Sequence, residues 1–110
     1  MKNINQSSNS PQEEQTKIIL FVAPDEPNSL VTEKSVRVFF EKSFKSSGSL
    51  KIINVFDDYN TAIEHNIVVV PTLIIKSPTS EKRIIGAIES ESLLSAILRR
   101  ENEEKENTGR

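Results

Sequence analysis

Two apolar, β-branched runs that flank one helical pattern constrain the fold of this chain most strongly. KIILFVA (17–23) and LKIINVF (50–56) are almost continuously apolar, as expected of strands that are buried on both faces. Between them, a valine and two phenylalanines recur at spacings of four, which predicts a helix that begins after Pro27 and runs to about Lys45. Strand, long helix and strand in this order form a βαβ unit, whose two strands run parallel.

Both ends of the long helix carry residues that suit a helix boundary. Asn28 or Ser29, which follow Pro27, can cap the first turn through their side-chain oxygens. Gly48 in KSSGS suits the left-handed conformation beyond the last turn. We therefore expect APDEPNS to be a stiff strand-to-helix turn, and Asn28 to have a structural role.

The middle of the chain predicts a short helix followed by a strand that begins at a proline. DDYNTAIEHN offers Asp57 and Asp58 as caps, and Ala62 and Ile63 as the apolar residues that anchor the helix. IVVVPTLIIK cannot be one uninterrupted central strand, because Pro71 has no amide proton to donate to a neighbouring strand.

The remaining segments predict a hairpin and a last helix. Residues 72–76 read as a third strand, SPTSE as a turn and KRIIGA (82–87) as a fourth strand paired with the third. Ser90 can cap a final helix with one apolar stripe, formed by Leu93, Leu94, Ile97 and Leu98. The predicted fold is α/β, in the order β-α-β-α-β-β-α, with a mixed four-stranded sheet.

The composition indicates a single domain between two polar ends. A chain of 110 residues fits one domain. Residues 1–16 and 102–110 are so polar that we expect flexible tails around a domain at 17–101. No signal-peptide core or membrane-spanning run is visible, which predicts a cytoplasmic protein.

The residue counts remove most kinds of chemistry. The chain has no cysteine, which excludes disulfides, thiolate nucleophiles and cysteine-held metal sites. His65 is the only histidine, and the three glycines form no phosphate loop. We therefore expect no enzyme activity, no cofactor and no metal. A net charge of −2, without a block of like charges, favours neither nucleic acid nor a membrane as a partner.

The order of elements, with VVPT opening the third strand, is similar to the thioredoxin fold. In that fold a Val-Pro-Thr stretch typically holds a cis proline, which assigns a structural role to Pro71. Only X-Pro bonds adopt the cis form at low cost, so general chemistry agrees. Because the loop after the first strand has no cysteine, thioredoxin activity is excluded.

Several motifs together resemble the KaiB family of bacterial clock proteins. LFVAPDEPNS is similar to its first strand and "VAG..PNS" loop, LKIINV to its "LKVIDV" strand, and VVPTLIIKSPTSEKRIIGAIE to its "ATPTL…P…RRIIGDLS" segment, which includes Gly86. The resemblance covers 18–98. It implies a non-catalytic adaptor that docks on a KaiC-type hexameric ATPase and changes its phosphorylation rhythm.

The resemblance also suggests partner-binding residues and a second hypothesis. Lys51 matches a lysine associated with partner competition, and we expect Pro78 and Arg83 of the predicted hairpin to contact the partner as well. The alternative is a stand-alone version of the KaiB-like sensor domains that serve histidine kinases. The partner is then a histidine kinase or another signalling protein, and the output is clock or stress signalling.

Some KaiB-family members exchange between a tetrameric ground-state fold and a thioredoxin-like monomer. The family's last segment often holds a helix-disfavouring "GLD", where this chain has Ile97, Leu98 and Arg99, or Ala96 after a shift of one residue. Replacing glycine favours a helix by about 0.5–1 kcal/mol. Our hypothesis is that the thioredoxin-like state prevails here.

Overall fold

The computed structural model describes residues 15–108, with side chains as far as Arg100. Its elements follow the predicted order: β2 (Thr16–Val22), α2 (Pro27–Ser43), β3 (Gly48–Asn54), α3 (Tyr59–Glu64), β4 (Thr72–Lys76), β5 (Glu81–Ile85) and α4 (Glu91–Thr108). Residues 1–14, most of the predicted N-terminal tail, lie outside the described range, so that assignment stays a prediction. The last helix continues to Thr108, past the expected domain end at 101.

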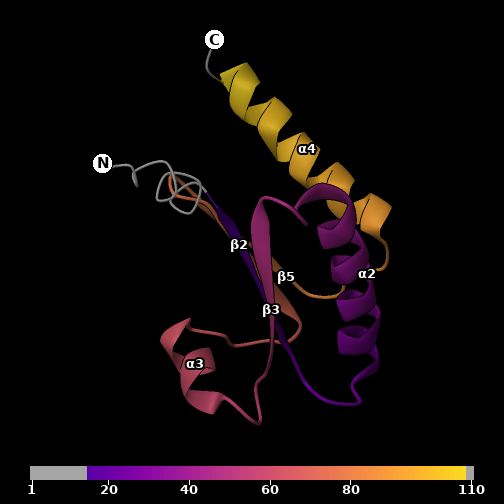
Figure 1. Cartoon of the computed structure of the whole chain (residues 1–110), viewed down its shortest axis with the longest axis vertical. Coiled ribbons are helices and arrows are strands. Elements are labelled where there is room, and N and C mark those ends of the chain that lie inside the picture. The colour runs from indigo at the N-terminus through magenta and orange to yellow at the C-terminus, as the bar shows by residue number, and fades with distance from the viewer. Residues whose placement is uncertain (1–14, 109–110) are drawn as a thin grey trace, which may run out of the picture.

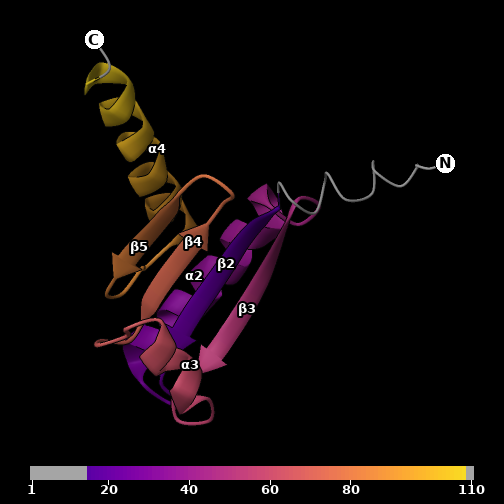
Figure 2. The same ribbon diagram turned by 90° about the vertical axis from the view of Figure 1, so that its left-hand side faces the viewer.

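The four strands form one mixed sheet in the order β3-β2-β4-β5. Strand β3 is parallel to β2, whereas β4 is antiparallel to both β2 and β5. Figures 1 and 2 show α2 and α4 on one face of the sheet, and the short α3 over one end of the other face. The predicted α/β architecture with a mixed four-stranded sheet is confirmed.

Two apolar clusters hold the helices on the sheet, one on each face. The larger cluster joins Leu20 of β2 to Val36 of α2 and Leu94 of α4, and all three side chains are fully buried. The smaller cluster joins Phe21 of β2 to Ala62 of α3. Because successive strand residues point to opposite faces, β2 contributes to both clusters, as its continuous apolar run predicted.

Helix α2 begins with a cap other than the predicted one. The carboxylate of Glu26 accepts hydrogen bonds from the backbone N–H groups of Ser29 (2.7 Å) and Asn28 (3.1 Å). Asn28 therefore lies in the first turn, and the prediction that it caps the helix is wrong. The Ser29 hydroxyl instead accepts a hydrogen bond from the N–H of Ala23 at 3.1 Å. Pro27 occupies the first helical position, where its missing N–H costs nothing. The cap is therefore Glu26, the residue before Pro27.

Gly48 is needed for close contact and not for a left-handed turn. The helix ends at Ser43, and Gly48 is the first residue of β3, paired with Thr16 of β2. A Cβ atom at Gly48 would lie 2.7 Å from the carbonyl oxygen of Thr16. The predicted helix-ending role of Gly48 is therefore wrong, because the neighbouring strand, and not the backbone angle, excludes a side chain.

The ends of β4 and β5 are joined next to the predicted proline. The Val70–Pro71 peptide bond is cis. The carbonyl of Pro71 accepts a hydrogen bond from the N–H of Gly86 at 2.9 Å. Gly86 has a φ of 104°, a backbone conformation that residues with side chains rarely adopt.

Helix α4 starts as the sequence predicted. The hydroxyl of Ser90 accepts a hydrogen bond from the N–H of Leu93 at 3.0 Å, and an ion pair of 3.2 Å joins Lys42 of α2 to Glu91. The helix runs without a break through 96–99. No helix within 15–108 has the length and apolar character that a bilayer span requires.

Candidate protein-binding surface

The loop between β2 and α2 uses its polar side chains to hold the backbone. Glu26 caps the helix, and the Ser29 hydroxyl accepts a hydrogen bond from the N–H of Ala23. Asp25, between Ala23 and Glu26 in the chain, adopts a left-handed φ of 63°. The sequence provides no thiol for this loop. Its geometry therefore serves to direct the chain from strand into helix.

His65 also has structural contacts. Its Nδ1 lies 2.9 Å from the carbonyl oxygen of Thr61, and its ring packs against Phe21 with 5.4 Å between the ring centroids. Its own carbonyl accepts a hydrogen bond from Arg83 at 2.6 Å. Within the described residues, no group of three His, Cys, Asp or Glu side chains is placed to hold a metal ion.

A tight turn after β3 brings an aromatic side chain to the surface. The side-chain oxygen of Asn54 accepts a hydrogen bond from the N–H of Phe56 at 2.9 Å, and its carbonyl accepts from the N–H groups of Asp57 and Asp58. Such turns are typical of asparagine. The strand therefore ends at Asn54, before the predicted end at Phe56, and Phe56 is 73% exposed.

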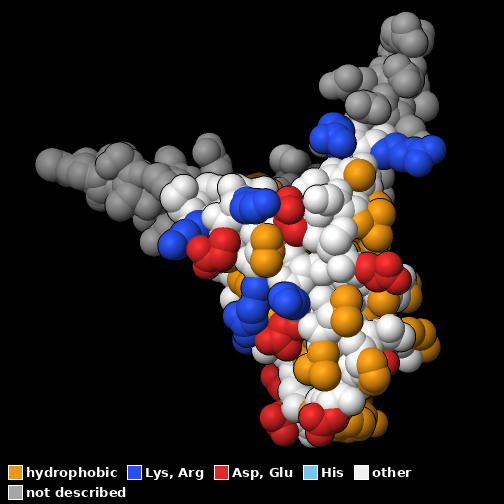
Figure 3. Space-filling model, turned by 90° about the vertical axis from the view of Figure 1, so that its right-hand side faces the viewer, with side chains coloured by type: hydrophobic (Ala, Val, Ile, Leu, Met, Phe, Trp, Pro, Cys, Tyr) orange, Lys and Arg blue, Asp and Glu red, His pale blue; other side chains and the backbone are white. Residues whose placement is uncertain are grey.

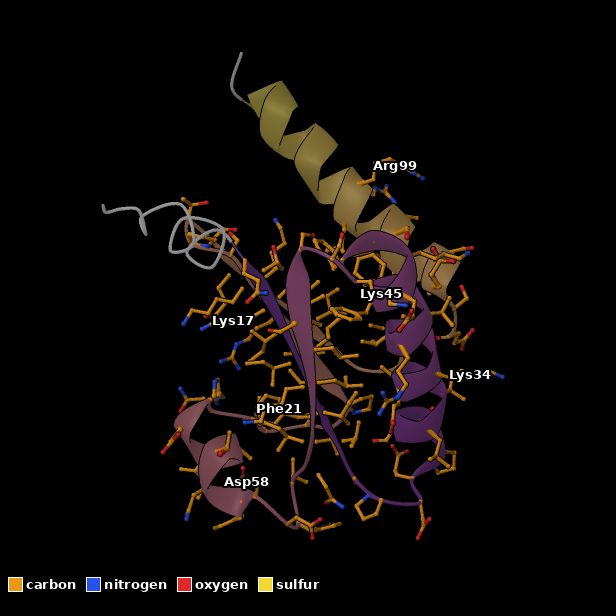
Figure 4. The ribbon with its side chains drawn as sticks, viewed as in Figure 1. Lys17, Phe21, Lys34, Lys45, Asp58 and Arg99 are labelled. Atoms are coloured by element: carbon orange, nitrogen blue, oxygen red, sulfur yellow. The ribbon has the colours of Figure 1, made fainter. Side chains whose placement is uncertain are left out.

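Helix α3 is short and is anchored by one residue. Asp58 caps it by accepting hydrogen bonds from the N–H (3.3 Å) and hydroxyl (2.8 Å) of Thr61; Figure 4 labels Asp58 there and Phe21 on the sheet. Ala62 is buried, as predicted, but Ile63 is 53% exposed, so its prediction as a second anchor is wrong. Tyr59 lies one helical turn before Ile63 and is also largely exposed.

The segment after α3 adds further exposed apolar residues. Asn66 has a left-handed φ of 58°, and the irregular segment that follows leads to the cis peptide bond at Pro71. Val68 is 91% exposed and Val69 49%. Large apolar side chains with such exposure are notable when they lie side by side, because contiguous apolar patches mark binding surfaces.

These side chains border a groove of about 350 Å³ between α3 and the adjoining loops. Apart from the tyrosine hydroxyl the lining side chains are apolar, and the larger ones are Val55, Phe56, Tyr59, Ile63, Ile67, Val68 and Val70. We call this surface the α3 groove. Ala23, which directly follows β2, also lines it, as Val55 does after β3, so the groove lies at the carboxyl ends of these two parallel strands.

Acidic residues lie close to the α3 groove in the chain. Asp57 and Asp58 stand between the groove residues Phe56 and Tyr59, and Glu64 follows Ile63. Asp57 and Glu64 are exposed. Figure 3, which views the molecule from the opposite side, that of α2, shows acidic and hydrophobic side chains together at the lower tip there as well. The surface therefore combines an apolar hollow with negative charge.

None of the three predicted partner-binding residues lines the α3 groove, although Arg83 donates a hydrogen bond to the carbonyl of His65 at the end of α3. Lys51 lies on the edge strand β3, and Arg83 on the opposite edge strand β5, where its guanidinium is 3.5 Å from Glu81. Pro78 is exposed in the turn between β4 and β5, where the N–H of Ser77 binds the carbonyl of Ser80 at 2.8 Å. Lys51 and Arg83 share one sheet face, whereas Pro78 lies at the far end of the hairpin.

Sequence reasoning missed the groove because Phe56 was assigned to a buried strand and Ile63 to the buried side of a helix. The run Ile67–Val70 looks like a core strand by composition. A usable signal was present, since Pro71 shortens the strand and leaves these valines without a neighbouring strand. Asn54 was a second signal, because asparagine favours turns and lies two residues before Phe56.

The comparisons with known proteins decide the family. The model for the KaiB domain matches residues 19–100. The chain belongs to the KaiB family. It is 39% identical over 67 residues to the circadian clock oscillator protein KaiB of Thermosynechococcus vestitus, a match that covers 61% of this chain and 62% of that protein. The KaiB protein of Synechococcus sp. strain CC9311 is also 39% identical, with 61% and 56% covered. The chain thus spans less than two thirds of the length of these relatives.

Solved structures show that this KaiB-family chain has a thioredoxin-like fold. Chloroplastic thioredoxin z has a TM-score of 0.68 at 16% identity, covering 89% of this chain and 88% of that one. The germline-specific thioredoxin Deadhead of Drosophila has a TM-score of 0.65 at 13% identity, with 87% and 89% covered. At such identities the likeness concerns the fold alone. The relatives matched by sequence are clock proteins by name.

Proposed function

We propose that this KaiB-family chain is a non-catalytic adaptor that docks on a KaiC-type hexameric ATPase and modulates clock or stress signalling. The observation that carries the proposal is the α3 groove. Val68 and Phe56 are 91% and 73% exposed beside an apolar hollow of about 350 Å³. Leaving such side chains in water is unfavourable, and a partner that covers them recovers the hydrophobic free energy.

Two further features support docking in place of catalysis. The loop after β2 has no thiol, and the side chains of Glu26 and Ser29 are occupied by hydrogen bonds from backbone N–H groups. Among the described residues β3 is an edge strand, so the N–H and C=O groups of its outer edge can pair with an added strand of a partner. Lys51 on this edge strand is proposed as an additional contact, together with Arg83 and Pro78.

Co-elution with a purified KaiC-type ATPase, with and without ATP, tests the proposal. Val68→Glu places a charge in the groove and should weaken binding at least about tenfold, as expected for a central interface residue. Val31→Glu is the matched control, because Val31 is 44% exposed on α2, outside the groove. We expect its binding to match the wild type, and circular dichroism to show that both variants are folded.

The same experiment contains the outcomes that contradict the proposal. If the wild type binds no KaiC-type ATPase in either nucleotide state, the adaptor function is wrong. If it binds a sensor histidine kinase instead, the chain is a stand-alone docking domain of that pathway. If both valine variants lose binding equally, the partner does not use the α3 groove.

A further inference from the structure

The sheet face that carries α3 is only partly covered. Alternate strand residues point to this face, and in β2 these are Lys17, Ile19 and Phe21. Phe21 is fully buried beneath α3, whereas Lys17, four residues earlier, is exposed. Figure 2 shows α3 in front of one end of the strands only, and Figure 4 shows Lys17 near the other end. A part of the sheet therefore faces solvent.

The strand register gathers positive charge on this open part. Lys17 of β2 lies directly opposite Lys76 of β4. Ile19, the next residue of β2 on this face, lies opposite Lys51 of β3. All three lysines are exposed, and they come from three neighbouring strands of the sheet. We call Lys17, Lys51 and Lys76 the lysine face.

This arrangement is unfavourable for the isolated chain. Like charges directly opposite each other on adjacent strands destabilise a sheet. The described residues provide no ion pair for the lysine face. Glu81 is opposite Lys76 in the register, but its carboxylate lies 3.5 Å from the Nε of Arg83. A sequence that keeps like charges opposite each other on an open surface, at a cost in stability, points to a function for that surface.

We propose that the lysine face binds an acidic segment of a partner protein. The charge is complementary, since three lysines that have no carboxylate partner among the described residues lie together on a chain whose net charge is −2. Strands are spaced by roughly 4.8 Å, so the lysines span about 10 Å from β3 to β4. Carboxylates at alternate positions of an extended peptide are about 7 Å apart, so one short acidic stretch reaches all three.

An acidic protein segment fits this surface better than nucleic acid does. Single-stranded nucleic acid is held by aromatic side chains on which its bases stack. The aromatic residue of β2 on this face, Phe21, is buried beneath α3 and cannot take part. Ile19, half-buried between Lys17 and Lys51, instead offers a small apolar contact for a peptide side chain.

Fluorescence anisotropy on the full chain tests the proposal with a labelled peptide of about ten alternating Glu and Ala residues, long enough to cross the sheet. The peptide should bind at low salt and lose affinity at about 0.5 M salt, where screening is strong. A Gln-Ala peptide of the same length should not bind. Lys17→Gln and Lys76→Gln should each weaken binding roughly fivefold, as expected when one charge pair is lost.

Lys34→Gln is the matched control, since Lys34 is an exposed lysine on the outer side of α2 (Figure 4). It should bind the Glu-Ala peptide as the wild type does. Lys76→Gln removes a like-charge contact, so its melting temperature should not fall, and lost binding cannot then be attributed to unfolding.

Three results would overturn the proposal. These are no binding of the Glu-Ala peptide, an equal loss in Lys34→Gln and Lys76→Gln, and tighter binding of an oligothymidine than of the peptide. The last result would assign the surface to nucleic acid. Val68→Glu should keep its peptide binding, so this test fails or succeeds independently of docking at the α3 groove.

Discussion

The side-chain hydroxyl of Thr32 in α2 accepts a hydrogen bond from the backbone N–H of Ile88, 2.8 Å away in the segment that leads into α4. Both residues are almost completely buried, at 0% and 1% exposure. The bond joins positions 56 residues apart. Since no water can replace a partner at this depth, one hydroxyl holds the C-terminal segment on α2.

Thr32→Val should destabilise the fold by about 1–3 kcal/mol, because it leaves the buried N–H of Ile88 without an acceptor. Urea denaturation monitored by circular dichroism measures this free energy of unfolding. Thr32→Ser keeps the hydroxyl and removes only a methyl group, so it should cost less than the valine variant. A valine variant as stable as the wild type would show that the hydrogen bond is unimportant.

Gly48→Ala should destabilise the pairing of β2 with β3. The added Cβ would lie 2.7 Å from the carbonyl oxygen of Thr16, a backbone atom that cannot move without shifting the strand. Overpacking of this kind costs roughly 1–3 kcal/mol. The melting temperature reports the loss, and hydrogen exchange should show it concentrated in β2 and β3.

Gly86→Ala is the useful comparison for Gly48→Ala. Apart from Gly86 itself and its two chain neighbours, no described residue has an atom within 4 Å of a new Cβ at Gly86, so the cost would come from the φ of 104° alone. Hydrogen-exchange changes should then centre on the β4–β5 junction. Identical exchange patterns for the two variants would contradict the distinction between a steric and a conformational glycine.

The sequence predicted the elements that form the core, because burial leaves a periodic pattern. The two βαβ strands, α2 and the β4–β5 hairpin were found from apolar spacing, and β4 was found with the bounds that it has. The ends of the helices and strands were harder to predict. Glu26 replaced Asn28 as the cap, and Asn54 ended β3 early, because single side chains decide these points.

The two proposed binding surfaces were less predictable for a physical reason. An exposed valine such as Val68 and a buried one such as Val36 look alike in a sequence, and only the packing separates them. The lysine face was hidden as well, since Lys17 and Lys76 are 59 positions apart and meet only through the strand register. Lys51 alone was selected, and through a family resemblance.

The Glu26 cap predicts a pH dependence of stability. Burial opposes ionisation of this carboxyl, but the hydrogen bonds from Ser29 and Asn28 outweigh it and hold the pKa of Glu26 below its ordinary value. Because the folded-state pKa is the lower one, the stabilisation is complete above the ordinary carboxylate pKa. It is lost as the pH falls through the folded-state pKa.

Thermal melts of the wild type and Glu26→Gln between about pH 7 and pH 2.5 measure this effect, since glutamine does not titrate in this range. The wild type should be the more stable protein at neutral pH, and the difference should shrink in acid. A difference that stays constant over the range would mean that the charge of Glu26 plays no part in the cap.

The unbroken helix at 96–99 leads to a prediction about conformational preference. Ala96 lies within α4, where glycine would be less favourable by about 1 kcal/mol. Ala96→Gly should therefore raise the exchange rates of the α4 amides roughly fivefold, as expected for that free energy. Ala87→Gly is the control, because Ala87 lies outside the helices and should leave α4 unchanged. If NMR shows equal exchange in both variants, helix propensity at Ala96 does not set the stability of α4, and the hypothesis that it favours the thioredoxin-like state is wrong.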